Sequence, residues 1–192
     1  SLFSLTAFNI EKTNTSRQVA PGRFEQTGKV RSRGVELGVV HDLGAGFAGL
    51  GAYTFVDAQI DDGSANDGNQ LARIPKHTAS LWLSYDVQTE ALSGLTIGGG
   101  LRYIGERFAN DANTEAFRFP AVTLVDASIS YARNQWRATL AARNLTNKDY
   151  VTFCSTSTVG PLLGFTEAQL IEADGCTYAA GREVNLTVSR VF

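Results

Sequence analysis

The feature that most constrains the fold is a two-residue alternation of apolar and polar side chains that recurs along the chain. In the closing segment 183–192, for example, Val184, Leu186 and Val188 alternate with Asn185 and Thr187. Side chains on a β-strand point to opposite faces in turn, so this period indicates strands whose two faces meet different surroundings. The sequence therefore predicts an all-β fold.

The lengths of the connections between these strands indicate how the strands are arranged. The alternation predicts eight strands, over residues 2–13, 27–42, 47–60, 76–87, 95–108, 121–132, 136–151 and 181–192. Short connections near 42–46, 88–94 and 133–135 alternate with long ones near 14–26, 60–73, 106–118 and 153–180. Strict alternation of short and long connections is typical of outer-membrane barrels, with short periplasmic turns and long extracellular loops. A soluble β-sandwich, the alternative, has no reason to keep every second loop short.

The two faces of the predicted strands also favour a membrane wall. In the segment 136–143, Trp136 and Leu140 alternate with Arg137 and Arg143. Two arginines are costly in a dry core but natural on a face that lines a polar lumen. Aromatic residues near the strand ends are expected to form the girdles of a transmembrane antiparallel β-barrel in contact with the lipid bilayer: Tyr53, Phe55, Tyr85, Tyr103, Tyr131 and Trp136.

Composition limits the other possibilities. The 192 residues contain no methionine, which predicts a processed chain or a piece of a longer protein. The formal net charge of −2 argues against a nucleic-acid partner. No apolar run approaches the roughly 18 residues of a membrane-spanning helix. No Ser/His/Asp set lies on a plausible common rim, so we expect no enzyme and no catalytic residues.

Two cysteines, Cys154 and Cys176, bound the longest connection. An even number of cysteines flanked by loops predicts a disulfide in an oxidising compartment, with two buried free thiols as the alternative. Between them, Thr166 and Gln169 have capping-box spacing and Gly175 follows, which predicts a short helix.

Five motifs occur in the order found in one protein family: VRSRGVEL (30–37), IPKHTASLWLSYDV (74–87), GGLRYIGERF (99–108), FPAVTLVDASISY (119–131) and RNLTNKDYVTFC (143–154). With these motifs, the chain resembles the C-terminal third of TonB-dependent siderophore receptors, in particular the ferrichrome-like hydroxamate branch. The resemblance spans almost the whole chain.

The resemblance implies a Gram-negative outer-membrane transporter that takes up iron as a ferric siderophore of the hydroxamate class, with the iron held by the siderophore. It implies a 22-stranded barrel of which residues 1–192 supply the last eight strands. The N-terminal plug, the other strands and the segment that contacts TonB would then lie outside this chain. Long loops would be extracellular and the C-terminus periplasmic.

The resemblance also assigns individual residues. Phe192 would be the signal read by the barrel-assembly machinery, although Arg190 stands where the family usually has an aromatic residue. Candidate siderophore contacts near the barrel mouth are the loop aromatics Phe108, Phe117, Phe153 and Tyr178, with loop packing as the alternative for each. Ser155 stands where related receptors often carry an aromatic residue after the first cysteine.

A self-contained eight-stranded outer-membrane barrel with a structural or adhesion role is the second hypothesis for the whole chain. Side chains would then have to fill the barrel interior. Gly98 and Gly100, which are expected to face inward, would leave such a small barrel poorly packed.

Overall fold

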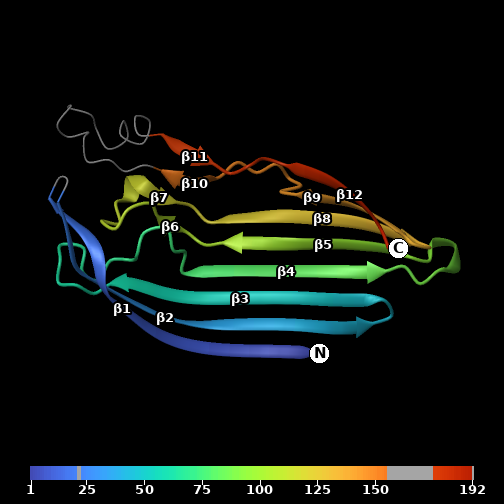
Figure 1. Cartoon of the computed structure of the whole chain (residues 1–192), viewed down its shortest axis with the longest axis horizontal. Helices are drawn as coiled ribbons and strands as arrows, with labels where there is room; N and C mark the ends of the chain where they lie inside the picture. The colour runs from blue at the N-terminus through green and yellow to red at the C-terminus, as the bar shows by residue number, and fades with distance from the viewer. Residues whose placement is uncertain (21–22, 155–174, 192) are drawn as a thin grey trace.

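The chain forms one large antiparallel sheet. The computed structural model describes residues 1–20, 23–154 and 175–191. Eight strands are hydrogen-bonded in the order β1-β2-β3-β4-β5-β8-β9-β12, so each pairs with its neighbours along the chain (Figure 1). The all-β antiparallel architecture and the number of principal strands are as predicted. Across the described residues, no helix is long and apolar enough to cross a membrane.

The principal strands differ in length. Their bounds are β1 Leu2–Ala20, β2 Arg23–Gly44, β3 Phe47–Ile60, β4 His77–Asp86, β5 Leu95–Ile104, β8 Val122–Arg133, β9 Trp136–Arg143 and β12 Glu183–Arg190. Two small sheets accompany them, β6 (Arg107–Phe108) with β7 (Arg118–Phe119) and β10 (Val151–Cys154) with β11 (Cys176–Tyr178). Two short 3₁₀ turns, η1 (Glu90–Leu92) and η2 (Glu115–Phe117), lie in connections.

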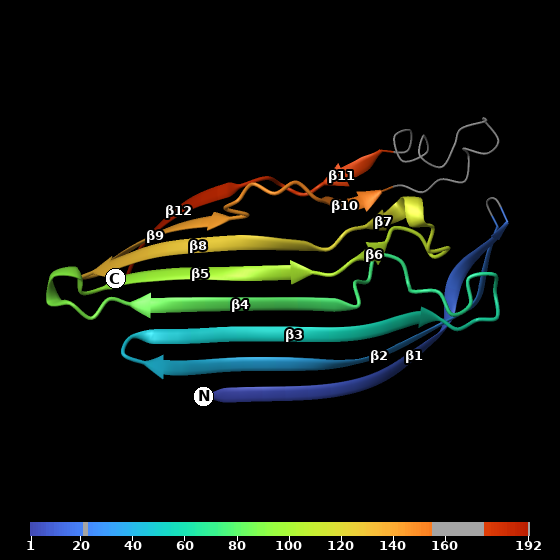
Figure 2. The same cartoon turned by 180° about the vertical axis from the view of Figure 1, so that it is seen from behind.

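The connections divide between the two ends of the sheet, as Figures 1 and 2 show. At one end, called here the short-turn end, the connections are residues 45–46, 87–94 and 134–135. At the other, the long-loop end, the connections 61–76, 105–121 and 144–182 carry β6, β7, β10 and β11. The predicted alternation of short and long connections therefore holds for these six connections.

The expected long connection at 14–26 is wrong. β1 and β2 continue as a paired ribbon as far as Ala20 and Arg23, beyond the rest of the sheet. Register shifts after Lys12, Thr15 and Gln18, with Asn14 in the left-handed region at φ 57°, interrupt the two-residue period. Because an irregular ladder breaks the alternation of side chains, the sequence of this segment resembles that of a polar loop.

β9 also ends earlier than predicted, at Arg143 instead of residue 151. Asn144 and Asn147 take left-handed backbone angles, with φ of 49° and 52°. Asparagine tolerates this region, and the Asn144 side chain accepts a hydrogen bond from the Lys148 amide, which closes a turn. β5 likewise ends at Ile104, and Gly105 leads into β6.

One face of the sheet, called here the apolar face, is built from exposed hydrophobic side chains. Leu81, Leu101 and Ile129 remain 50%, 47% and 44% exposed. Each has a cross-strand neighbour of the same kind, as in the pairs Leu81–Leu101 and Ile129–Leu140. A continuous exposed apolar surface of this extent needs an apolar medium against it. The 10-residue strands β4 and β5 have the length that a tilted strand needs to cross a bilayer.

Aromatic side chains border the apolar face at both ends. Tyr53 and Tyr103 both pair with Ala79 and lie toward the long-loop end, where the Tyr53 hydroxyl and His77 Nδ1 are 2.8 Å apart. Toward the short-turn end, the Phe47 and Tyr85 rings are 4.4 Å apart. Tyr131 and Trp136 lie at that end on β8 and β9. The predicted girdle residues thus fall into two rows, as amphipathic rings do at the two interfaces of a membrane.

The opposite face, the polar face, is packed around Trp82. The Trp82 side chain lies over Gly98 and Gly100 of the neighbouring strand β5. A Cβ at either glycine would come within 2.5 Å of a ring carbon of Trp82. The two glycines, expected to leave gaps, instead form the slot that holds this ring.

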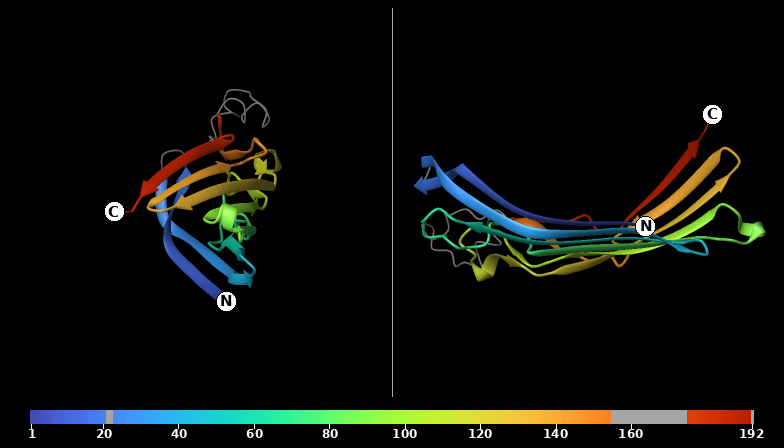
Figure 3. Two further views of the ribbon diagram at one scale, coloured as in Figure 1. Left: turned by 90° about the vertical axis from the view of Figure 1, so that its right-hand side faces the viewer. Right: turned by 90° about the horizontal axis from the view of Figure 1, so that it is seen from below.

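The sheet is open and curved, as Figure 3 shows. β1 and β12 form its two edges. A self-contained eight-stranded barrel would require β1 to pair with β12, and the ladder found among the described residues does not make that closure. The predicted last-strand residue Phe192 lies outside the described residues, as does the helix predicted between the two cysteines.

The Trp82 slot gives a first testable expectation. Substitution Gly98→Val or Gly100→Val must displace the Trp82 ring, and overpacking of this kind costs about 1–3 kcal/mol. We expect a lower thermal midpoint in the heat-modifiability assay of the full-length protein. Gly99→Ala on the apolar face is the matched control, because the nearest atom to its Cβ is 3.8 Å away. Equal thermal midpoints for all three variants would contradict the tight packing of Trp82 over Gly98 and Gly100.

Candidate functional site

The long-loop end holds the candidate site, and its base is a network between two connections. In the connection 61–76, the Ala72 amide donates to Asp111 Oδ1 at 3.0 Å and the Arg73 amide to the Phe108 carbonyl at 2.7 Å. Gln70 and Asn113 exchange two further bonds of 2.8 Å each between backbone and side chain. The side-chain bonds join residues that are 39–43 positions apart in the sequence. They therefore hold the two loops together as one unit.

A small apolar core supports the disulfide above this network. Ala109, Phe117 and Phe119 pack with Cys154, and Val151 and Cys176 lie against them. Cys154 and Cys176 are directly paired across β10 and β11 and form a disulfide, with Cα atoms 4.1 Å apart. The predicted disulfide is therefore confirmed. It fixes the register of the hairpin at the point where the hairpin packs on η2 and β7.

Arg107 links the two small sheets. It is 7% exposed, its guanidinium lies 5.2 Å from the centre of the Phe119 ring, and its Nη2 donates to the Val151 carbonyl at 3.1 Å. Burial lowers the pKa of Arg107 below its usual value. An arginine still keeps its charge at neutral pH, so the contact is a charge-assisted one.

Arg73 supplies an exposed cation beside one of the candidate aromatics. Its guanidinium lies 4.5 Å from the centre of the Phe153 ring. Its backbone takes the left-handed region, with φ 69°, which favours glycine or asparagine and is strained for arginine. Strain of this kind is found at ligand-binding positions and requires surrounding structure to hold it. The Arg73–Phe108 backbone bond is part of that structure.

The four candidate aromatics lie at this end but differ in exposure. Phe153 on β10 is 38% exposed and Tyr178 on β11 is 64% exposed. Phe108 is half-buried at the end of β6. Phe117 is 7% exposed and belongs to the apolar core under the disulfide. Phe153 and Tyr178 are therefore the most exposed of the four.

A second polar anchor ties the connection after β9 to the sheet. On the polar face, Asp126 accepts bonds from Arg102 Nε at 2.5 Å and Nη2 at 3.0 Å, which is a bidentate pair. Asp126 Oδ1 also accepts the Asn144 amide at 2.9 Å. The Asn144 side chain then holds the turn that begins the connection to β10.

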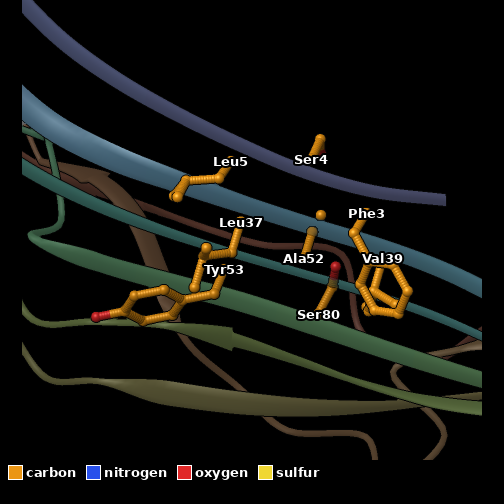
Figure 4. A pocket seen from close by; sticks show the side chains of 10 residues that line it. Phe3, Ser4, Leu5, Leu37, Val39, Ala52, Tyr53 and Ser80 are labelled. Carbon is orange, nitrogen blue, oxygen red and sulfur yellow. The ribbon is translucent and has the colours of Figure 1, made fainter.

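Among the hollows in the described part of the chain, two lie at places that bear on the site and on the apolar face. One, of about 320 Å³, is at the long-loop end and is lined by charged and polar side chains, including Lys12, Lys29, Asp62 and Asp111. The other, of about 530 Å³, lies over β1–β4 and is bordered by Phe3, Leu5, Leu37 and Tyr53 (Figure 4). The second belongs mainly to the apolar face, where a bilayer would cover it. In the described ranges, no group of three or more His, Cys, Asp or Glu side chains is placed to hold a metal ion.

Comparison with known proteins identifies this arrangement. Residues 1–145 match the family model described as TonB dependent receptor-like, beta-barrel. The chain belongs to this family. Its members are receptors and transporters of the Gram-negative outer membrane and are not enzymes. The apolar face with its aromatic borders is thus part of a barrel wall.

Curated relatives place the chain within the family. It is 36% identical over 192 residues to the Escherichia coli K12 ferrichrome outer membrane transporter/phage receptor, a match that covers 96% of this chain and 23% of the relative. It is 34% identical over 163 residues to the Salmonella typhimurium ferrioxamine B receptor, covering 81% of this chain and 23% of the relative. The chain therefore spans about a quarter of the length of the relatives it matches.

Solved structures agree on the fold. The siderophore receptor PiuA of Acinetobacter baumannii superposes with a TM-score of 0.73 at 26% identity, covering 97% of this chain and 25% of that one. The ferric yersiniabactin uptake receptor FyuA of Yersinia pestis gives a TM-score of 0.77 at 15% identity, covering 97% and 27%. The second likeness concerns the fold alone.

Sequence reasoning missed the two arginines of the site. Arg73 and Arg107 stand in polar surroundings without a recognisable spacing, and their aromatic partners are 80 and 12 residues away. The one sequence signal was that both arginines fall within or beside the family motifs at 74–87 and 99–108.

The disulfide gives a second testable expectation. The disulfide closes a loop with a sequence separation of 22 residues. Because it constrains the unfolded chain, it should stabilise the folded protein by about 3 kcal/mol. In Cys154→Ser/Cys176→Ser, we expect backbone amides of β10 and β11 to exchange with deuterium much faster, while β4 and β5 keep their protection. Wild-type protein treated with a reductant should behave like the variant. Unchanged protection of β10 and β11 in both samples would contradict a structural role for the disulfide.

A third expectation concerns Asp126. Asp126→Asn removes the charge that Arg102 faces, and we expect the free energy of unfolding to fall by about 1–2 kcal/mol. The loss is modest because the Arg102 side chain is 42% exposed, so solvent screens the ion pair. Thermal unfolding and faster amide exchange at residues 144–148 would show it. Asp86→Asn is the control, since Asp86 is exposed and accepts a hydroxyl bond from Thr96. A variant as stable as wild type would show that Asp126 does not stabilise the connection after β9.

Proposed function

We propose that this chain forms the last eight strands of a 22-stranded outer-membrane barrel that takes up ferric siderophores. The observation that carries the proposal is the rigid, disulfide-held hairpin that presents Phe153 and Tyr178 at the long-loop end. At about 24 residues per strand, 22 strands need about 530 residues. The chain spans about a quarter of its relatives, so the other strands and the plug would come from the rest of the protein.

We place the long-loop end outside the cell and the short-turn end in the periplasm. The two-residue turns at 45–46 and 134–135 and the long, hydrogen-bonded connections at the other end support this orientation. The C-terminus is then periplasmic. The plug would carry the segment that contacts TonB, and the barrel-assembly machinery would read the last strand, ending at Phe192.

For the ligand, we propose a ferric siderophore of the hydroxamate class. Two of the curated relatives are named for ferrichrome and ferrioxamine B, which supports this choice. The siderophore itself holds the iron, so the protein would contribute shape, apolar surface and a few polar anchors. Phe153 and Tyr178 would touch the ligand, with Phe108 beside them, and Phe117 would act through the core under the disulfide.

Arg73 is the polar anchor that fits this role best. It is exposed and stacks on Phe153, so its guanidinium can meet ligand oxygens without losing its support. The 320 Å³ hollow at the same end adds Lys12, which is exposed, on the neighbouring ribbon of β1 and β2.

The test is siderophore binding by the full-length protein that contains this chain. We expect Phe153→Ala and Tyr178→Ala each to weaken binding of a ferric hydroxamate about tenfold, as truncation of an aromatic contact does. Leu92→Ala, on an exposed residue at the short-turn end, is the control and should leave binding unchanged.

The outcomes separate the parts of the proposal. Binding of a ferric catecholate but not of a hydroxamate would overturn the ligand class. Wild-type affinity in both aromatic variants would overturn the assignment of the contacts. No binding or uptake of any ferric siderophore by the intact protein would overturn the function.

A further inference from the structure

The hairpin that carries Phe153 is irregular next to that residue. In the pairing of β10 with β11, Val151 lies opposite Tyr178, whereas Phe153 lies opposite Thr177. Two steps along β10 therefore correspond to one step along β11, which is a β-bulge at Thr152. A bulge bends its strand and changes the direction of the side chains beside it. The direction of Phe153 thus depends on how this bulge is held.

The two residues after the bulge go to different surroundings. Cys154 is 3% exposed and packs in the apolar core under the hairpin. Phe153 is 38% exposed, and the centre of its ring lies 4.5 Å from the guanidinium carbon of Arg73. The contact between Phe153 and Arg73 is therefore made directly after the bulge.

A bulge leaves backbone groups without a partner in the ladder, and here two side chains form bonds beside it. The Val151 carbonyl accepts a hydrogen bond of 3.1 Å from Arg107 Nη2. Thr152 Oγ1 donates to the Thr177 carbonyl at 2.9 Å. An unpaired backbone group in a buried place costs about as much free energy as a lost hydrogen bond. Arg107 and Thr152 therefore stabilise the bulge at two successive residues of β10.

Arg107 suits this role because of its burial and its shape. It is 7% exposed, and its guanidinium lies 5.2 Å from the centre of the Phe119 ring. Within the described part of the chain, the Val151 carbonyl is its one hydrogen-bond acceptor. A guanidinium can lay a flat face on an aromatic ring and donate from its edge, whereas an ammonium has no flat face. The Phe119 ring thus orients the donor that reaches β10.

We propose that Arg107 is a positioning residue for siderophore binding. By holding the bulge of β10, it keeps the Phe153 ring over Arg73, where the ring can meet the ligand. Arg107 itself does not touch the ligand, so its effect on affinity passes through Phe153. This effect on affinity rests on the proposed siderophore function, whereas the effect on the direction of Phe153 does not.

The first measurement therefore needs no siderophore. It uses the full-length protein in detergent with para-fluorophenylalanine in place of Phe153, and fluorine NMR as the readout. Arg73→Gln gives the reference signal of a ring that has lost its guanidinium. We expect the signal in Arg107→Gln to move toward this reference, because the bulge loosens. Arg107→Lys keeps the charge without the flat face and should move the signal part of the way.

Arg118→Gln is the matched control. Arg118 lies on β7, which pairs with the strand of Arg107, but it is exposed and pairs with Glu106 and Glu115. Its loss should leave the fluorine signal and the siderophore affinity unchanged. Heat-modifiability on gels would show that each variant is folded. If Arg107→Gln does not fold, Thr152→Val removes the other bond at the bulge and should move the signal in the same direction.

The second measurement is a double-mutant cycle on siderophore affinity. The ligand is ferrichrome or ferrioxamine B, whichever the wild type binds more tightly. We expect Arg107→Gln to weaken binding about threefold to tenfold, no more than the roughly tenfold loss expected for Phe153→Ala. The double variant Arg107→Gln/Phe153→Ala should bind no more weakly than Phe153→Ala alone. A residue that only stabilises the fold would multiply the two losses instead.

Three results would overturn the inference. An unchanged fluorine signal in the folded variant would show that Phe153 does not depend on the bulge contacts. An equal change in Arg118→Gln would show a general effect of charge. Losses of affinity that multiply in the double variant would show that Arg107 does not act through Phe153. If the fluorine signal moves as expected but no siderophore binds, the positioning of Phe153 stands and the proposed function fails.

Discussion

The unbroken ladder of backbone hydrogen bonds from β1 to β12 is the constraint on which the rest of the structure depends. A barrel wall has no water to satisfy peptide groups, so each strand must find its partners in its neighbours. The ladder also fixes the register, which sends every second side chain to lipid. Leucines and isoleucines can then stay exposed on one face while Glu36, Arg102 and Asp126 occupy the other.

Above the wall, the stabilising contacts change in kind. The sheet proper relies on side-chain packing across strands, as in the Trp82 slot, whereas the long-loop end relies on side chains bonded to backbone over long sequence distances. A disulfide and a buried Arg107 complete that end. Rigid loops suit recognition of a preformed ligand, because less conformational entropy is lost when the ligand binds.

The regular strands could be predicted from the sequence because alternation survives wherever the ladder is regular, as in β4 and β5. The prediction from alternation was wrong at 14–26, where register shifts interrupt the two-residue period of a paired ribbon. It was also wrong after Arg143, where two asparagines with left-handed backbone angles end β9. The cysteine pair was predictable from its loop flanks. The Arg73–Phe153 contact was not, since it joins two connections that only the tertiary structure brings together.

The strict neighbour-to-neighbour pairing has a kinetic consequence. Every strand of the large sheet bonds to the strand before or after it in the ladder, so hairpins such as β4–β5 and β8–β9 can form from local contacts alone. Local contacts close quickly because little loop entropy is lost. The sheet can therefore grow by one hairpin at a time, each new strand adding to an edge that is already formed.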